Sequence, residues 1–344
     1  QRQMCIRDRI DVVFNYGLFS FNTPNFIFRF SLGETDYQLG ATDYERFAAE
    51  YAFFGRSVWQ QTLNLTDEEK TELIRLLQEN YRPENRVYRY NFFYDNCATR
   101  PRDKIEESIA GKVIYPAEPQ DGSLTFRDIV HQYCKGHPWA RFGIDLCIGS
   151  EADQPITQRQ MMFAPFYLMD AFDGAQIKGD SIQRPLITAN ELIVDATPEP
   201  DESDWMPTPL QCSLLLFILT AAATIYGIRR RTGLWGIDLF LFGIAGIVGC
   251  VLAFLALFSQ HPAVSSNFLL LVFHPGQLLF LPYIIYCVRK GKKCWYLTLN
   301  LAVLTLFIVL FPVIPQRFDF AVVPLALVLL IRSASNLIVT SKKK

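Results

Sequence analysis

Residues 81–103 read YRPENRVYRYNFFYDNCATRPRD, and this stretch decides the fold of the first half of the chain. Its turn-rich start and aromatic middle lead into Asp95 and Asn96, which precede Cys97 and a predicted helix over 98–109. Aspartate and asparagine are preferred residues at the position that caps a helix N-terminus. Cys97 is therefore expected in the first turn, where unpaired backbone amides and the helix dipole favour a thiolate.

The charges that follow Cys97 are unusual for the start of a helix. Arg100, Arg102 and Lys104 place cations where the helix dipole favours anions. Such a placement suggests a use, either holding a thiolate or gripping an anionic head group. The alternative is that Arg102 only pairs with Glu106, four residues later, while Cys97 packs as a small hydrophobic side chain.

The residues on either side of this stretch predict an α+β domain. Thr66 and Glu69 form the S/T-x-x-E capping box of a helix whose apolar face carries Leu73, Leu76 and Leu77. Extended segments are predicted at 11–21, 58–65 and 186–194. Further helices are predicted at 43–53, 126–133, 139–147 and 158–172.

Charge divides the chain into two parts of different character. The residues before Pro209 include 32 acidic and 21 basic side chains, whereas the remainder has 2 acidic and 12 basic side chains and is almost purely apolar. The first part is long enough to bury its own core. We therefore predict an extracytoplasmic domain over 10–195, a Pro- and acid-rich linker over 196–209, and a transmembrane domain over 210–344.

Five apolar stretches are long enough to cross the hydrocarbon core of a bilayer, which takes about 20 helical residues. They lie at 210–228, 234–258, 268–288, 295–313 and 318–339. Basic residues follow the first, third and fifth stretches, while the opposite connections contain only Arg317. Basic loops stay in the cytoplasm, so the N-terminal domain is expected outside it and the C-terminus inside.

The first nine residues, QRQMCIRDR, resemble a translated sequencing-adapter tail. We expect residues 1–9 to be a non-native artefact and Ile10 to be the first native residue. On this interpretation the true N-terminus is missing, together with the signal peptide that an exported domain needs. Of the cysteines, only Cys97, Cys134 and Cys147 remain in the exported domain, and whether Cys134 and Cys147 form a disulfide is left open.

Several motifs together suggest a family. The segment 81–103, with its Tyr-Asp-Asn-Cys-Ala-Thr-Arg core, resembles the hallmark of the periplasmic domain of Lnb-type lipoprotein N-acyltransferases. Similar matches are Asn15-Tyr16-Gly17, the segments 63–66, 137–139 and 143–145, and His261-Pro262 with Asn267. That family resembles circularly permuted papain-like hydrolases, including NlpC-type peptidases. The resemblance implies an α+β permuted papain-like (NlpC-like) extracytoplasmic domain followed by an all-α five-helix transmembrane domain.

The resemblance also implies where the catalytic base should be. In the family it lies in a Gly-His segment shortly upstream of the strand with Asn15-Tyr16-Gly17, a position that here falls before Ile10. The chain as given is therefore expected to be inactive. His131 and His137 are expected to have surface or capping roles, whereas His261 borders the membrane and could face the site, a lipid head group or neither.

These observations predict a membrane-bound thiol acyltransferase of the bacterial inner membrane, with a periplasmic N-terminal domain. Cys97 would take an acyl chain from a phospholipid as a thioester and pass it to the N-terminal amine of a lipoprotein. Tyr94, Asp95, Asn96, Arg100 and Arg102 are expected to support Cys97, and His261 and Asn267 to lie near the membrane. The alternatives are an NlpC-type cell-wall cysteine peptidase or amidase and a non-catalytic membrane scaffold.

Other kinds of chemistry have no support in the sequence. It contains no metal-ligand spacing, no Gly-rich phosphate loop and no nucleic-acid patch, so we expect no cofactor, no metal and no nucleic-acid partner. The partners expected are the phospholipid donor, the lipoprotein acceptor and membrane lipids. Asp238 and Arg332 are charges within predicted spans, where mutual pairing or snorkelling is favoured over a functional role.

Overall fold

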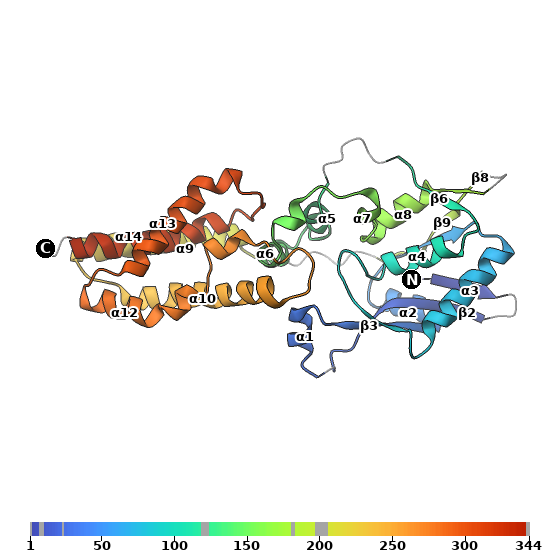
Figure 1. The fold of residues 1–344 in the computed structure, drawn as a ribbon, viewed down its shortest axis with the longest axis horizontal. Coiled ribbons are helices and arrows are strands. Elements are labelled where there is room, and N and C mark those ends of the chain that lie inside the picture. Colours follow the sequence, from blue (N-terminus) through green and yellow to red (C-terminus); the bar gives the residue numbers. More distant parts are fainter. Residues whose placement is uncertain are drawn as a thin grey trace. The chain divides into compact units, whose positions relative to one another are not determined.

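The computed structural model describes residues 2–6, 10–22, 24–117, 124–179, 183–196 and 206–341 (Figure 1). The chain forms two compact units. The first comprises Gln1–Ile129, Pro155–Asp201 and Gln260–Pro262, and the second comprises Val130–Gln154, Glu202–Ser259 and Ala263–Lys344. The predicted linker over 196–209 lies largely outside the described residues.

The largest sheet of the first unit is antiparallel and has the strand order β1-β2-β3-β5. Its strands are β1 (Arg2–Ile6), β2 (Ile10–Leu18), β3 (Asp36–Asp43) and β5 (Val87–Arg89). Along the β2–β3 pair the register shifts between Asn15 and Leu18, which marks a bulge beside Tyr16 and Gly17. Bulges re-aim side chains and are common next to functional sites.

The first unit also contains helices, of which α2 (Tyr44–Phe53) and α3 (Asp67–Tyr81) contact the strands of this sheet. The others are α1 (Phe26–Leu32), α4 (Thr99–Ser108), α7 (Gln158–Met161) and α8 (Pro165–Asp173); α5 (Phe126–Tyr133) begins in this unit. The capping box predicted at Thr66 and Glu69 is confirmed. The helix predicted over 158–172 is instead two helices, because Pro165 cannot donate a backbone hydrogen bond and starts a new helix.

Two smaller sheets complete the first unit. One pairs β4 (Val58–Leu63) with β9 (Ile187–Val194), and the other has the order β6 (Lys112–Ile114), β7 (Gln176–Lys178) and β8 (Gln183–Pro185). The core of the unit joins the large sheet to α3 and α4. It includes the buried side chains Tyr16, Leu39, Leu77, Ile105 and Leu186.

The second unit is helical. It contains α6 (Pro138–Cys147), α9 (Pro209–Arg230), α10 (Trp235–Phe258), α13 (Trp295–Leu310) and α14 (Val322–Ser341). Within the described residues, four stretches are long and apolar enough to span a membrane: α9, α10, α14, and α13 with the short turn that follows it. These correspond to the first, second, fourth and fifth predicted spans.

The third predicted span is not one continuous helix. Phe268–Leu279 and Leu281–Lys290 meet at an angle of 74°, and the segment consists of η2 (Phe268–Leu271), α11 (Gly276–Leu279) and α12 (Leu281–Lys290). Pro275 and Pro282 each remove a backbone donor here, and prolines are a regular cause of sharp kinks. Counting the bent pair as one span gives five.

The α11 segment packs closely on α10 through glycines. A Cβ atom at Gly249 would lie 2.4 Å from the backbone nitrogen of His274, and one at Gly246 would lie 2.5 Å from that of Leu278. Small residues let helix backbones approach in membranes. On the other side, His274 Nε2 lies 3.3 Å from Asn300 Oδ1, which belongs to α13. Glycines and polar side chains therefore hold the break in place.

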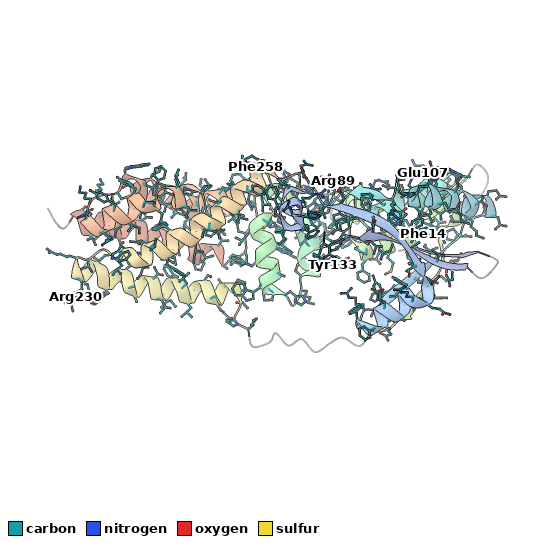
Figure 2. All side chains as sticks on the ribbon, turned by 90° about the horizontal axis from the view of Figure 1, so that it is seen from below. Phe14, Arg89, Glu107, Tyr133, Arg230 and Phe258 are labelled. Carbon is teal, nitrogen blue, oxygen red and sulfur yellow. The ribbon has the colours of Figure 1, made fainter. Side chains whose placement is uncertain are left out.

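Basic residues gather at one end of the helical bundle. Figure 2 places Arg230, at the end of α9, and Phe258, at the end of α10, at opposite ends of the bundle. The last turn of α9 carries Arg229 and Arg230, and that of α12 carries Arg289 and Lys290.

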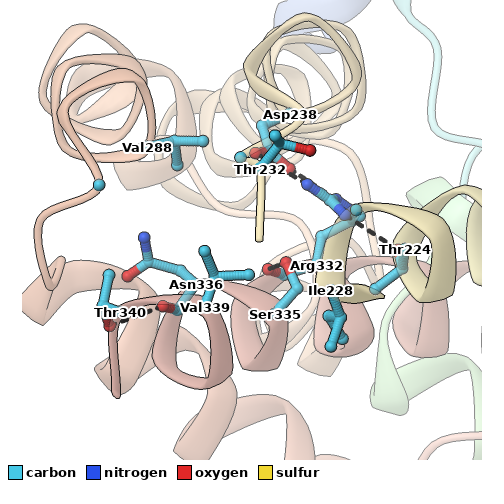
Figure 3. Close-up of a pocket in the computed structure, with 13 residues that line it drawn as sticks. Thr224, Ile228, Thr232, Asp238, Val288, Arg332, Ser335, Asn336, Val339 and Thr340 are labelled. Carbon is cyan, nitrogen blue, oxygen red and sulfur yellow. Dashed lines mark hydrogen bonds and ion pairs between the residues drawn. The ribbon is translucent and has the colours of Figure 1, made fainter. Parts of the chain in front are cut away.

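The two charges predicted within the spans pair with each other. Arg332 donates to both carboxylate oxygens of Asp238, at 2.7 and 3.0 Å, and to the hydroxyl of Thr224 at 2.9 Å (Figure 3). Both charged side chains are buried and border a pocket that also includes Gly227, Val288 and Asn336. The expectation of mutual pairing is confirmed.

Candidate active site

Cys97 lies in the turn before α4, two residues ahead of Thr99, and the Asn96 side chain holds this turn to the start of the helix. Asn96 Oδ1 accepts the backbone N–H groups of Ala98 at 2.8 Å and Thr99 at 3.0 Å, while the Thr99 hydroxyl accepts the Asn96 N–H at 2.8 Å. The Asn96 amide also donates to the carbonyls of Phe92 and Phe163. This buried residue therefore fixes the turn on which the exposed Cys97 lies.

Cys97 also lies against the large sheet. A Cβ atom at Gly17 of β2 would be 3.8 Å from the Cβ of Cys97. The predicted position of Cys97 beside the strand with Asn15-Tyr16-Gly17 is therefore confirmed. The residue lies in the turn that leads into the helix, and not in the first helical turn as predicted. Its catalytic role stays a prediction.

Three tyrosines surround the thiol, and sequence reasoning missed them as site residues. The rings of Tyr37 and Tyr90 stack with centroids 4.0 Å apart. Burial raises the pKa of Tyr90, as do negative charge at Cys97 and a hydrogen bond to that sulfur. Burial and the same charge also raise the pKa values of Tyr37 and Tyr88. The phenols therefore stay protonated at neutral pH, and the Tyr90 hydroxyl can donate to the sulfur.

The spacing of Tyr88 and Tyr90, two residues apart, could have predicted from the sequence that both rings lie on one side of a strand. Residues two apart on a strand point to the same face. The structure places Tyr88 in β5, which pairs with β3 through Tyr37. The Tyr88 hydroxyl donates to the backbone carbonyl of Tyr16, which ties β5 to the bulged end of β2.

The arginines after Cys97 bind carboxylates. Arg100 donates to both oxygens of Asp95, at 2.6 and 2.7 Å, and its guanidinium carbon lies 3.7 Å from the centroid of the Tyr88 ring. Asp95 therefore orients Arg100 over the ring beside the thiol. Asp95 and Arg100, both expected to support Cys97, thus contact each other, and Arg100 also contacts the Tyr88 ring.

Arg102 has a packing role. It donates to Asp103 at 2.9 Å and to the backbone carbonyl of Arg159 at 3.0 Å. The alternative in which Arg102 pairs with Glu106 is not what the structure has, because Arg159 reaches Glu106 from a segment 53 residues later in the chain, at 2.9 and 3.0 Å. Tyr94 is exposed, and its ring lies edge-on to Phe93 and Phe126.

The histidines occupy three separate settings. In the first unit, His261 Nε2 lies 2.6 Å from the carbonyl of Phe30, and its ring packs on Phe30 and Phe92. Burial lowers the pKa of His261, although the hydrogen bond to Phe30 acts in the opposite direction. In the second unit, His131 lies 2.8 and 3.0 Å from the Asp145 carboxylate oxygens. His137 is the residue before α6; it makes no side-chain cap and is exposed, so of the surface or capping role expected for it the structure shows the surface position.

Asn267, Cys134 and Cys147 lie in the second unit. Asn267 is buried, caps η2 through the backbone N–H of Leu269, and donates to the carbonyl of Leu146 at 2.7 Å. It therefore has a structural role in the loop between two spans. Cys134 and Cys147 are both free thiols. Burial raises the pKa values of both, and the charge of Asp145 adds to this effect at Cys134.

Comparison with known families supplies the context for this geometry. A family model described as the Lnb N-terminal periplasmic domain matches residues 4–131, and one described as the Lnb transmembrane domain matches residues 201–344. The chain belongs to the Lnb family. It is a membrane protein with an N-terminal periplasmic domain of mixed α/β structure and a following helical domain. No curated protein and no solved structure matches the chain significantly.

Family membership indicates a role in modifying membrane lipoproteins. Cys97 lies in the part matched by the periplasmic-domain model. Among the residues that the structure describes, no group of three or more histidine, cysteine or acidic side chains is arranged to hold a metal ion. The candidate site therefore consists of Cys97, Gly17, the three tyrosines and the Asp95–Arg100 pair.

Proposed function

We propose that the protein is a cysteine acyltransferase that moves an acyl chain from a phospholipid to the N-terminal amine of a lipoprotein. The observation that supports this most is the exposed thiol of Cys97 in the turn before α4, beside Gly17, in a chain that both Lnb family models match. An exposed thiol next to a residue without a side chain leaves room for an ester carbonyl to approach the sulfur.

In the first step the Cys97 sulfur attacks an ester carbonyl carbon of the phospholipid. The thiol proton goes to a base, the carbon–oxygen bond to glycerol breaks, and the alkoxide takes a proton to leave as a lysophospholipid. Cys97 then holds the acyl chain as a thioester. A nucleophile of this kind divides one difficult transfer into two easier ones.

In the second step the lipoprotein amine attacks the thioester carbonyl. An amide bond forms, the carbon–sulfur bond breaks, and Cys97 is released as a thiolate. The proton that the amine loses can return the thiolate to a thiol. The Tyr90 hydroxyl, which interacts electrostatically with Cys97, would stabilise negative charge on the sulfur in both steps. No cofactor takes part in this scheme.

The proposed location is the bacterial inner membrane, with the C-terminus in the cytoplasm. Basic residues at the ends of α9 and α12 support this orientation, because basic loops stay in the cytoplasm. Phosphatase fusions test it. A phosphatase should be active when fused after Ile314 and silent when fused after Lys293, and the reverse pattern would contradict the orientation.

The chemistry is tested in a bacterial strain that lacks its own lipoprotein N-acyltransferase. The gene that encodes this chain is introduced in its natural form and as Cys97→Ala, and lipoprotein N-termini are analysed by mass spectrometry. We expect N-acylated product with the natural gene and none with Cys97→Ala. Cys134→Ala is the matched control, because it removes a free thiol of the second unit.

Each result has a distinct meaning. N-acylated product with Cys97→Ala would rule out the thioester route. Cleaved cell-wall peptides in place of acylated lipoprotein, still dependent on Cys97, would indicate an NlpC-type peptidase. Trapping of an acyl thioester on the peptide that contains Cys97 separates these two enzymes, because only the transferase takes its acyl group from lipid.

A further inference from the structure

Helix α1 is apolar and has no buried residue. Its sequence is FIFRFSL, and the side chain of Ile27 is 81% exposed. Phe21, in the turn before the helix, is 74% exposed, and Phe28 is also exposed. The one cation of the helix, Arg29, is paired with Asp36 at 2.8 Å. A contiguous apolar surface of this kind marks an interaction site on a folded domain.

Hydrogen bonds connect α1 to a segment that follows a membrane span. The backbone N–H of Gln260 donates to the carbonyl of Leu32 at 2.8 Å, and His261 Nε2 lies 2.6 Å from the carbonyl of Phe30. Gly33, at a φ of 75°, ends the helix. The backbone of His261 lies so close to it that a Cβ atom at Gly33 would be 2.9 Å from the His261 nitrogen. These contacts lie within the first unit, to which Gln260–Pro262 belong.

The chain itself limits how far α1 can lie from the bilayer. The apolar helix α10 ends at Phe258, so Gln260 follows it by two residues. Two extended residues span about 7 Å at most, at 3.3–3.6 Å per residue. The last residues of a span lie at the membrane boundary, where aromatic side chains are enriched. The C-terminal end of α1 is therefore tied to a segment that starts at this boundary.

Aromatic rings extend from α1 to the tyrosines around the thiol. Phe30 lies 6.0 Å from Phe92, and Phe92 lies 5.3 Å from Tyr90, measured between ring centroids. On a second route, Phe26 lies 5.8 Å from Phe19, and Phe19 lies 4.9 Å from Tyr37. Both routes end at the stacked pair of Tyr37 and Tyr90 beside Cys97.

We propose that α1 and the adjoining Phe21 form a membrane-inserting surface that lies in the outer leaflet and leads a phospholipid acyl chain along these rings to Cys97. The occupant of the exposed surface is the hydrocarbon boundary of the bilayer. Short apolar segments bind membranes in proportion to the apolar area that they bury. The delivery of an acyl chain rests on the proposed function, whereas the insertion of α1 does not.

Photocrosslinking of the full chain tests the insertion. The photoreactive residue p-benzoylphenylalanine replaces Ile27, and in a matched control it replaces Phe53, which is 83% exposed at the end of α2. Each variant is reconstituted in vesicles of phosphatidylethanolamine and phosphatidylglycerol with tagged acyl chains. After illumination, we expect several-fold more tagged lipid on the peptide with residue 27 than on the peptide with residue 53.

The same experiment can overturn the inference. Equal labelling at the two positions, or none at residue 27, would contradict membrane insertion. A crosslink from residue 27 to a second copy of the chain, in place of lipid, would identify a protein interface. Because Ile27 is exposed, its replacement is not expected to disturb the core.

An activity measurement separates this inference from the proposed function. In the lipoprotein assay, Ile27→Asp should lose N-acylated product and Ile27→Leu should keep it, because only the charge opposes insertion. Crosslinking at residue 27 should persist in Cys97→Ala. If lipid labels residue 27 but Ile27→Asp retains full product, the surface inserts but does not deliver the acyl chain. If product persists in Cys97→Ala, the thioester mechanism fails while the insertion stands.

Discussion

Gly17 and Cys97 are neighbours across the site: a Cβ atom at Gly17 would lie 3.8 Å from the Cβ of Cys97. This contact joins the bulged end of β2 to the turn before α4, two segments about 80 residues apart. A contact of 3.8 Å is ordinary van der Waals distance, so one methyl group fits there. A longer side chain would extend into the space in front of the sulfur.

We therefore expect Gly17→Ala to fold normally and to leave Cys97 accessible, while Gly17→Leu covers the thiol. Alkylation by iodoacetamide, quantified by mass spectrometry on the peptide that contains Cys97, measures the effect. Gly17→Leu should slow alkylation clearly and Gly17→Ala only slightly. Equal rates in Gly17→Leu and the natural chain would show that Gly17 does not limit access to the sulfur.

Tyr90 is expected to stabilise negative charge on the Cys97 sulfur. Tyr90→Phe removes the hydroxyl but keeps the ring that stacks on Tyr37. Loss of a nearby donor disfavours the thiolate, so alkylation of Cys97 at neutral pH should slow several-fold. Alkylation by iodoacetamide, quantified on the peptide that contains Cys97, measures the effect.

The control for this prediction is Tyr37→Phe. Tyr37 is close enough for the charge at Cys97 to raise its pKa, but no hydrogen bond to the sulfur contributes to that shift. Its variant should slow alkylation of Cys97 much less than Tyr90→Phe does. Equal slowing in the two variants would mean that the general polarity of the pocket, and not one donor, stabilises the sulfur.

Local features of the sequence predicted local features of the structure. The capping box at Thr66 and Glu69, the position of Cys97 near a helix start and the four continuous spans depend on residues close in sequence, and all are confirmed. The broken third span was missed although Pro282 lies directly after its break. Hydropathy averaged over about 20 residues does not register a kink.

Features that depend on distant segments could not be predicted. Helix α1 is seven residues long, has no buried residue, and is held by His261, 231 residues after Phe30. Short helices have little intrinsic stability, so the local sequence alone does not predict one here. The tyrosines around Cys97 likewise converge only because β5 pairs with β3. The alternative pairing of Arg102 with Glu106 could not be tested from spacing alone, because Arg159 binds Glu106 from another helix.

Asn96 is expected to be the residue on which the geometry of the Cys97 turn depends most. Its buried side chain holds this turn to the start of α4 and donates to two carbonyls, at 2.8 and 2.9 Å. Asn96→Ala removes these bonds and leaves buried polar groups without partners, at a cost of about 1–3 kcal/mol. The thermal unfolding midpoint in detergent should fall, and alkylation of Cys97 should change. The exposed Asn22→Ala is the control, and an equal midpoint in both variants would contradict the prediction.

Asn96→Asp refines this test. Aspartate keeps an oxygen that can accept the N–H groups of Ala98 and Thr99, so these two bonds are retained. Its other oxygen would face the carbonyls of Phe92 and Phe163, which the asparagine amide now satisfies. We therefore expect Asn96→Asp to be destabilising as well. Full stability of this variant would show that the bonds to Ala98 and Thr99 matter and that the two carbonyl contacts do not.

Asp238 and Arg332 provide a test of charge pairing inside the helical bundle. Their side chains are each 2% exposed, and Arg332 makes two hydrogen bonds to Asp238 and one to Thr224. Asp238→Asn leaves a buried guanidinium without its counter-charge, which costs about 3–5 kcal/mol. Asp238→Leu with Arg332→Leu removes both charges and should cost much less, because no unpaired charge remains. Thermal unfolding of both variants in one detergent compares the two costs. A double variant less stable than Asp238→Asn would mean that the bundle depends on this polar contact for its packing and not only for charge balance.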